Sequence, residues 1–213
     1  MKSQDTELVV IVVSARKGGV GKSTIAAHTS VFAGSATVLI DADDQDTEGS
    51  SATWMQARAA KFPMFYSYSD YKQYGIDRLL AKAKADGAEF VVIDTPPKAD
   101  ASITELMRRA TVNVVVTEPS FLPLSALPRS LEIARSAGKS TIVVLNKIKA
   151  QRLETEQTRA ALAELGMPVV ELSDLADFGR ALAIGQAVHE FNAKSKASEQ
   201  IGVLWREIQK VIK

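Results

Sequence analysis

The sequence contains no cysteine. This excludes disulfide bonds, thiolate zinc sites, iron–sulfur clusters and a cysteine nucleophile. No apolar run is long enough to span a bilayer, and the first ten residues lack the pattern of a secretory signal peptide. Because a chain without cysteine is compatible with a reducing compartment, we expect a cytoplasmic protein.

Neither sign of charge dominates, since 26 basic residues stand against 25 acidic ones and the formal net charge is +1. The overall balance alone therefore predicts no polyanionic partner. The distribution is uneven, however, because basic residues gather over 194–213 and five carboxylates lie within 41–48. Carboxylates so close together repel one another unless a cation lies near them.

Short runs of consecutive apolar residues alternate with longer amphipathic stretches, which is typical of parallel strands covered on both faces. The expected strands are Leu8–Val13, Thr37–Ile40, Phe90–Ile93, Val112–Val116 and Thr141–Leu145, with weaker candidates at Met64–Tyr68 and Pro168–Leu172. The expected helices cover about 22–33, 48–61, 71–86, 102–110, 124–137, 154–165, 175–183 and 196–212. This alternation predicts a single α/β domain over 1–213, with a mostly parallel twisted sheet and helices on both faces.

The segment after the first expected strand has the composition of a phosphate-binding loop. It reads Lys17, Gly18, Gly19, Val20, Gly21, Lys22, Ser23 and Thr24. Its end matches the end of the P-loop motif, although Arg16 stands where the first glycine is expected. We expect Lys22 to contact the β- and γ-phosphates, Ser23 to bind Mg²⁺ and Thr24 to bond the α-phosphate. The alternative is a glycine-rich turn without a ligand, but the strand before it and the helix after it favour a P-loop NTPase.

Carboxylates follow two of the expected strands. Asp94 closes the strand at 90–93, and Asp41 and Asp43 follow the strand at 37–40. An aspartate at a strand end is often only a turn residue, but with a P-loop Asp94 is interpreted as the Walker B carboxylate, binding Mg²⁺ directly or through water. We expect Asp43 to orient the attacking water.

Together these segments resemble the ParA/MinD group of P-loop ATPases with a deviant Walker A motif, and most of all the small plasmid-partition ParA proteins. The segments that carry the resemblance are 17–24, 41–45 and 90–97, with weaker support from 118–120, 145–147, 180–188 and 194–205. The family usually has proline at the position of Asp44, where this chain is more acidic. The resemblance implies that ATP and Mg²⁺ bind, that Lys17 reaches the partner's phosphates across an ATP-dependent homodimer, and that Asn146 contacts adenine.

The resemblance also implies slow ATP hydrolysis, stimulated by a ParB-like or small centromere-binding adaptor, and non-specific DNA binding on the nucleoid. Such binding needs clustered basic residues and weakens steeply with salt. The candidates are Arg180, Lys147, Lys149, Arg152, Lys194 and Lys196.

Other functions on the same scaffold remain open. A close variant positions another cargo, such as a carboxysome or a chemoreceptor cluster, and a MinD-like protein binds membranes through a basic C-terminal helix. Here we expect the helix at 196–212 to pack on the sheet, so that a membrane is not a partner. An ATP-dependent metabolic enzyme is a further alternative, but the sequence offers no additional catalytic cluster to support it.

Overall fold

The computed structural model describes residues 7–34, 36–43, 50–62, 66–68, 71–97, 101–119, 127–149 and 151–213. Asp44, with the acidic segment that follows it, and Ser120 lie outside these residues. Among the helices that the structure describes, none has both the length and the apolar character needed to cross a membrane.

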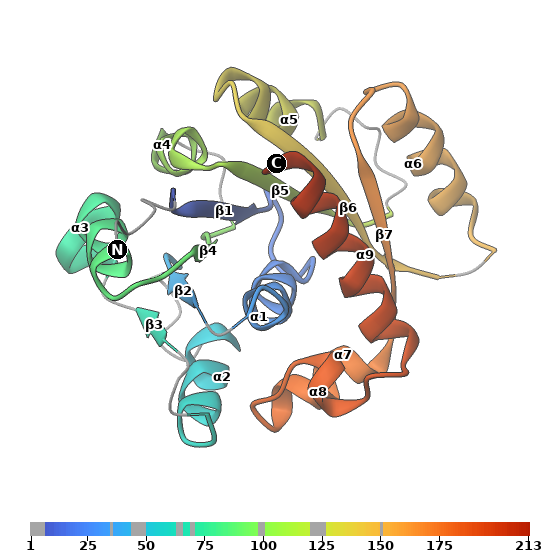
Figure 1. Cartoon of the computed structure of the whole chain (residues 1–213). Coiled ribbons are helices and arrows are strands. Elements are labelled where there is room, and N and C mark those ends of the chain that lie inside the picture. Colours follow the sequence, from blue (N-terminus) through green and yellow to red (C-terminus); the bar gives the residue numbers. More distant parts are fainter. Residues whose placement is uncertain are drawn as a thin grey trace.

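The seven expected strands form one sheet, in the order β3-β2-β4-β1-β5-β6-β7 (Figure 1). Its strands are β1 (Val9–Ser14), β2 (Thr37–Asp41), β3 (Tyr66–Tyr68), β4 (Phe90–Asp94), β5 (Val112–Thr117), β6 (Ser140–Ile148) and β7 (Val169–Ser173). Every pair of neighbouring strands is parallel. The predicted α/β architecture is confirmed, because strands that are apolar at consecutive positions need cover on both faces.

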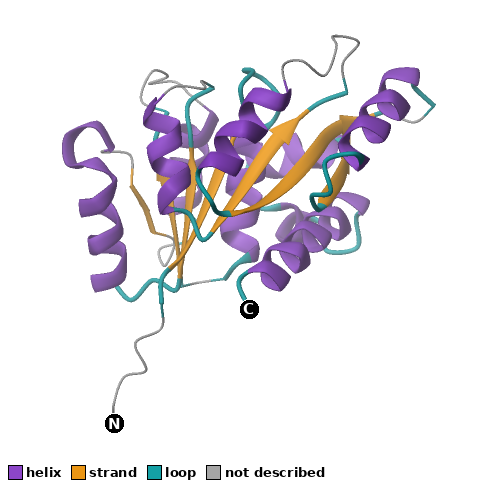
Figure 2. Ribbon diagram, turned by 90° about the horizontal axis from the view of Figure 1, so that it is seen from above, coloured by secondary structure: helices purple, strands orange, loops and turns teal. Residues whose placement is uncertain are grey.

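Helices cover both faces of this sheet (Figure 2). They are α1 (Lys22–Phe32), α2 (Ser50–Ala59), α3 (Tyr71–Ala85), α4 (Ala101–Arg109), α5 (Leu127–Ser136), α6 (Leu153–Ala163), α7 (Ala176–Ala183), α8 (Val188–Phe191) and α9 (Lys196–Val211). Ile11 and Val13 of β1 join one core cluster with α1, α2, α7, α8 and α9. Val10 and Val12 join the other, with α3, α4, α5 and α6. Alternate residues of one strand thus supply two cores.

Two elements differ from the prediction. β6 continues to Ile148 instead of ending at Leu145, and the short helix α8 was not expected. The packing predicted for the C-terminal helix is confirmed, because Ile201, Leu204 and Ile208 of α9 are fully buried. An apolar stripe facing the core in this way stabilises the domain.

Helix α2 is fastened to residues 184–190 by a group that we call the α2 clamp: Arg58, Phe62, Gly185 and Glu190. Arg58 Nη1 and Nη2 donate to the two carboxylate oxygens of Glu190, at 2.8 and 3.0 Å. Nη1 also donates to the Gly185 carbonyl at 3.2 Å, and the guanidinium lies 4.3 Å from the Phe62 ring centroid. Arg58 is only 5% exposed, so this charge is buried together with its partners.

Helix α1 is covered by the C-terminal helices at His28. This side chain is fully buried, and its Nδ1 accepts the Val188 N–H at 3.3 Å. Its ring lies 5.5 Å from that of Phe178 on α7. Burial is the main cause that lowers the pKa of His28 to about 4. His28 is therefore a neutral core residue.

Candidate functional site

The site lies at the carboxyl ends of the central strands. β1 sits between β4 and β5, so the sheet extends in opposite directions from it. In open parallel sheets, ligands bind at such a switch point, beyond the strand ends. Asp94 is in register with Val13 of β1 and with Asp41 of β2. Sequence segments far apart in the chain therefore meet where the loop after β1 begins.

The loop between β1 and α1 has the backbone of an anion-binding turn. Gly19 and Gly21 have φ values of 77° and 92°, in the left-handed region that glycine adopts without steric strain. Gly21 is the N-cap of α1, and no side chain caps this helix end. The first turn of α1 holds no acidic residue. The N–H groups and the positive end of the helix dipole are thus suited to an anion such as phosphate.

Lys22 and Asp94 form a buried ion pair at this loop. The Lys22 Nζ lies 2.8 Å from Asp94 Oδ1, and the two side chains are 7% and 1% exposed. Ser23 follows Lys22 on the first turn of α1. A buried lysine needs a compensating charge. An incoming phosphate can provide that charge in place of Asp94, which leaves the carboxylate available to a cation.

The carboxylates of β2 lie beside this pair. The Asp43 N–H donates to Asp41 Oδ1 at 2.9 Å, which fixes the turn after the strand. Burial, aided by the charges of Asp94 and Asp43, raises the pKa of Asp41 to about 6, against the opposing effect of that hydrogen bond. Carboxylate and hydroxyl oxygens are the ligands that Mg²⁺ prefers. Among the described residues, no three carboxylate or histidine side chains converge on one metal position, so Asp94 and Ser23 would need phosphate or water oxygens to complete a magnesium site.

Lys17 does not point freely into solvent. Its Nζ lies 2.7 Å from Glu118 Oε1 just after β5, and its side chain is 68% exposed. The Glu118 side chain is 24% exposed, so the lysine end of this pair is hydrated and the carboxylate end is largely covered. An ion pair with one end in water contributes little to stability.

Two residues of β6 donate hydrogen bonds to the loop between β1 and α1. Asn146 Nδ2 donates to the Val20 carbonyl at 2.7 Å, and Lys147 Nζ donates to the Gly19 carbonyl. Beside them lies a cavity of about 170 Å³. Its lining includes Gly21, Thr24, Asn146, Leu175 and Phe178. Its lining combines apolar side chains with polar ones, including Thr24, Asn146 and Asp174, a mixture that is suited to a heterocyclic base. Leu175 and Phe178 were not predicted, and no motif in the sequence indicated them.

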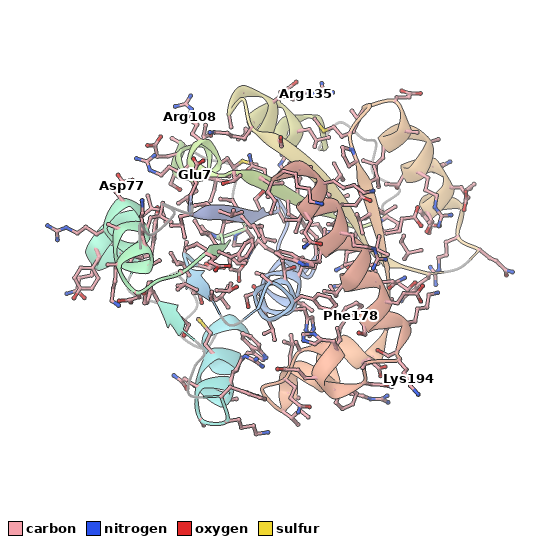
Figure 3. All side chains as sticks on the ribbon, in the orientation of Figure 1. Glu7, Asp77, Arg108, Arg135, Phe178 and Lys194 are labelled. Carbon is pink, nitrogen blue, oxygen red and sulfur yellow. The ribbon has the colours of Figure 1, made fainter. Side chains whose placement is uncertain are left out.

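The six basic candidates for DNA binding fall into two groups, and all are exposed. Lys147, Lys149 and Arg152 line a cavity of about 290 Å³ beside the site. Lys149 pairs with Asp174 there, at 3.2 Å. Arg180 is on α7, Lys194 lies in the turn between α8 and α9, and Lys196 begins α9. Figure 3 shows Lys194 at the lower right of the molecule.

Comparison with known proteins agrees with this geometry. Residues 11–188 match the sequence profile of the CobQ/CobB/MinD/ParA nucleotide binding domain. No curated protein sequence gives a significant match.

Solved structures share the fold at low sequence identity. A candidate plasmid partition protein from Borrelia burgdorferi bound to AMPPNP superposes with a TM-score of 0.71 at 16% identity, covering 96% of this chain and 100% of that one. MinD from Pyrococcus horikoshii with Mg-ADP gives 0.74 at 18%, covering 96% and 97%. A variant of McdA from Cyanothece in complex with ATP gives 0.73 at 16%, covering 97% of both chains.

Proposed function

Because the chain belongs to the CobQ/CobB/MinD/ParA nucleotide-binding family, we propose that it binds ATP with Mg²⁺ and hydrolyses it. The observation that carries this proposal is the buried Lys22–Asp94 pair, 2.8 Å apart, beside an uncapped helix N-terminus. A lysine, a carboxylate and free backbone N–H groups at one point are the parts that phosphoryl transfer to water requires.

Each group has a role that its position supports. The backbone of Gly18, Gly19, Val20 and Gly21 and the Lys22 amine bind the phosphates, and Thr24 contacts the α-phosphate. Ser23 and Asp94 would hold Mg²⁺, and the ion would supply positive charge against the charge that develops on the phosphoryl group. Asp43 orients the attacking water, and the cavity beside Asn146 receives adenine.

We further propose that two chains close face to face over ATP, with each Lys17 turning from Glu118 of its own chain to the phosphates of the other. This dimer binds DNA non-specifically and segregates plasmid or chromosomal DNA with a centromere-binding adaptor. Arg180, Lys194 and Lys196 are the leading DNA contacts, because all three are exposed and the segments that carry them, α7 and the start of α9, are both joined to α8 (Figure 1). Lys149 and Arg152 are secondary candidates. Lys147 contributes least, because its amine is bound to Gly19.

Hydrolysis is tested with Asp43→Ala. We expect the variant to lose turnover while its affinity for ATP stays within a few-fold of the unaltered chain. The matched control is Asp86→Ala, which removes an exposed carboxylate bound to Lys82 away from the site. Unchanged turnover in Asp43→Ala would refute the role of Asp43, and no turnover by the unaltered chain with DNA and adaptor would refute the ATPase proposal.

DNA binding is tested by titrating random-sequence duplex DNA without nucleotide, with ADP and with ATP–Mg²⁺, at two salt concentrations. We expect binding with ATP only, weaker at high salt because released counterions oppose it. Arg180→Gln should weaken binding, whereas Arg135→Gln, on α5 at the far side of the molecule (Figure 3), should not. Failure to bind in any state while ATP binds would refute the partition role and favour a MinD-like or metabolic one.

A further inference from the structure

Strand β6 is irregular where it passes the phosphate loop. Its pairing with β7 advances from Leu145 to Ile148 while β7 advances only from Glu171 to Ser173, which defines a bulge. Lys147, inside the bulge, has φ 56°. A non-glycine residue in this left-handed region has an unfavourable backbone energy of about 1–2 kcal/mol. Bulges of this kind re-aim side chains near functional sites.

The bulge brings two consecutive side chains to one loop. In a regular strand, Asn146 and Lys147 would point to opposite faces of the sheet. Here both donate hydrogen bonds to the phosphate loop, Asn146 to the Val20 carbonyl and Lys147 to the Gly19 carbonyl. The Asn146 bond is 2.7 Å long, and the residue is 7% exposed. The strained backbone is therefore coupled to a contact with the loop.

Holding these carbonyls also sets the direction of the N–H groups. In a trans peptide, the carbonyl of one residue and the N–H of the next point in opposite directions. Fixing the carbonyls of Gly19 and Val20 toward β6 thus turns the N–H groups of Val20 and Gly21 away from β6. The approach is close, since a Cβ on Gly21 would lie 2.3 Å from Asn146 Nδ2.

We propose that Asn146 and Lys147 are positioning residues that preorganise the phosphate loop, an inference that rests on the proposed nucleotide binding. They act on the phosphates through the backbone, and Asn146 does so in addition to any contact with the base. Preorganised N–H groups bind an anion without a reorganisation cost. The ligand chemistry that they govern is the polyphosphate chain, independent of the base.

The test separates polyphosphate affinity from base affinity. Inorganic tripolyphosphate, ADP–Mg²⁺ and adenosine are titrated calorimetrically into the full chain and its variants. Lys147→Gly keeps the left-handed backbone accessible and removes the amine, Lys147→Arg restores a donor, and Asn146→Ala removes the amide. The matched control is Lys210→Ala, an exposed lysine on α9 whose amine pairs with Glu207.

We expect Lys147→Gly and Asn146→Ala each to weaken tripolyphosphate and ADP binding about tenfold. This is the factor expected when one hydrogen bond that orients groups around a charged ligand is lost. Lys147→Arg should recover most of this loss, and Lys210→Ala should leave binding unchanged. Adenosine affinity should not change in Lys147→Gly. Unfolding midpoints without ligand check that Lys147→Gly, a change at an exposed residue, folds normally.

Two failures are distinguishable. If the unaltered chain binds neither ADP nor tripolyphosphate, the proposed function fails and the inference fails with it. If the unaltered chain binds both and Lys147→Gly binds them equally well, or loses adenosine affinity to the same extent, the inference alone is overturned.

Discussion

Replacing Arg58 by alanine tests the α2 clamp as a contribution to stability. The guanidinium is buried, makes two hydrogen bonds to Glu190 and one to Gly185, and stacks on Phe62. Removing one partner of a buried ion pair lowers the free energy of unfolding by about 3–5 kcal/mol. The Glu190 side chain is 22% exposed, so water can hydrate it in the variant and reduce this loss. With the lost stacking included, we expect Arg58→Ala to lower the free energy of unfolding by about 3 kcal/mol.

The assay is urea unfolding, followed by far-UV circular dichroism and by tryptophan fluorescence to check that the transitions coincide. Arg109→Ala is the control, because this guanidinium makes its ion pairs at the surface, through Nε and Nη2 with Asp77 and through Nη1 with Glu105. Such a pair contributes only about 1 kcal/mol or less. A loss in Arg58→Ala no greater than in Arg109→Ala would refute the reasoning. A double-mutant cycle with Glu190→Gln should show that the two side chains are coupled.

Other predictions concern the glycine of the clamp, the core histidine and the phosphate-loop lysine. Gly185→Ala should lower the free energy of unfolding by more than about 2 kcal/mol, because φ is +71° and the new Cβ would lie 2.8 Å from the Ala57 backbone. Gly87→Ala is the control, because its φ is +82° but no atom lies within 4 Å of the new Cβ, and it should lower the free energy of unfolding by only about 1 kcal/mol. The folded-state pKa of His28, about 4, lies below its ordinary value of 6.5, so the unfolded chain binds the proton more tightly. The free energy of unfolding should therefore fall by up to about 3 kcal/mol as the pH falls from 6.5 to 4. Urea unfolding over a series of pH values should show this loss in the unaltered chain and not in His28→Gln. Lys22→Ala should abolish the rise in melting temperature that ATP–Mg²⁺ produces in the unaltered chain, and a retained rise would contradict the phosphate role of Lys22.

The sheet and the phosphate loop could be predicted because their signals are local. Consecutive apolar residues mark each parallel strand, and the glycines before Lys22 stand between a strand and a helix. Asp94 could be predicted as a Walker B carboxylate, because an aspartate at a strand end is typical of that role in a chain with a P-loop. Its binding of Mg²⁺ stays a prediction.

The rest depends on contacts between distant residues. Arg58 and Glu190 are 132 positions apart, and nothing near either one indicates the other. The bulge at Lys147 arises from pairing with β7, so the sequence pattern ended β6 at Leu145. Phe178 enters the site only because α7 packs against α1. Local patterns contain no information on such tertiary contacts.

The position of α1 has a consequence for synthesis on the ribosome. This helix is the second element of the chain, yet its cover comes from α7, α8 and α9, the last three. β1 to β4 are synthesised early, but Phe32, which packs near Gly202 of α9, stays exposed until α9 has been synthesised. The wall that Phe178 gives to the cavity beside Asn146 is also made late. Until α7, α8 and α9 have left the ribosome, α1 therefore exposes an apolar surface and this cavity lacks one of its walls.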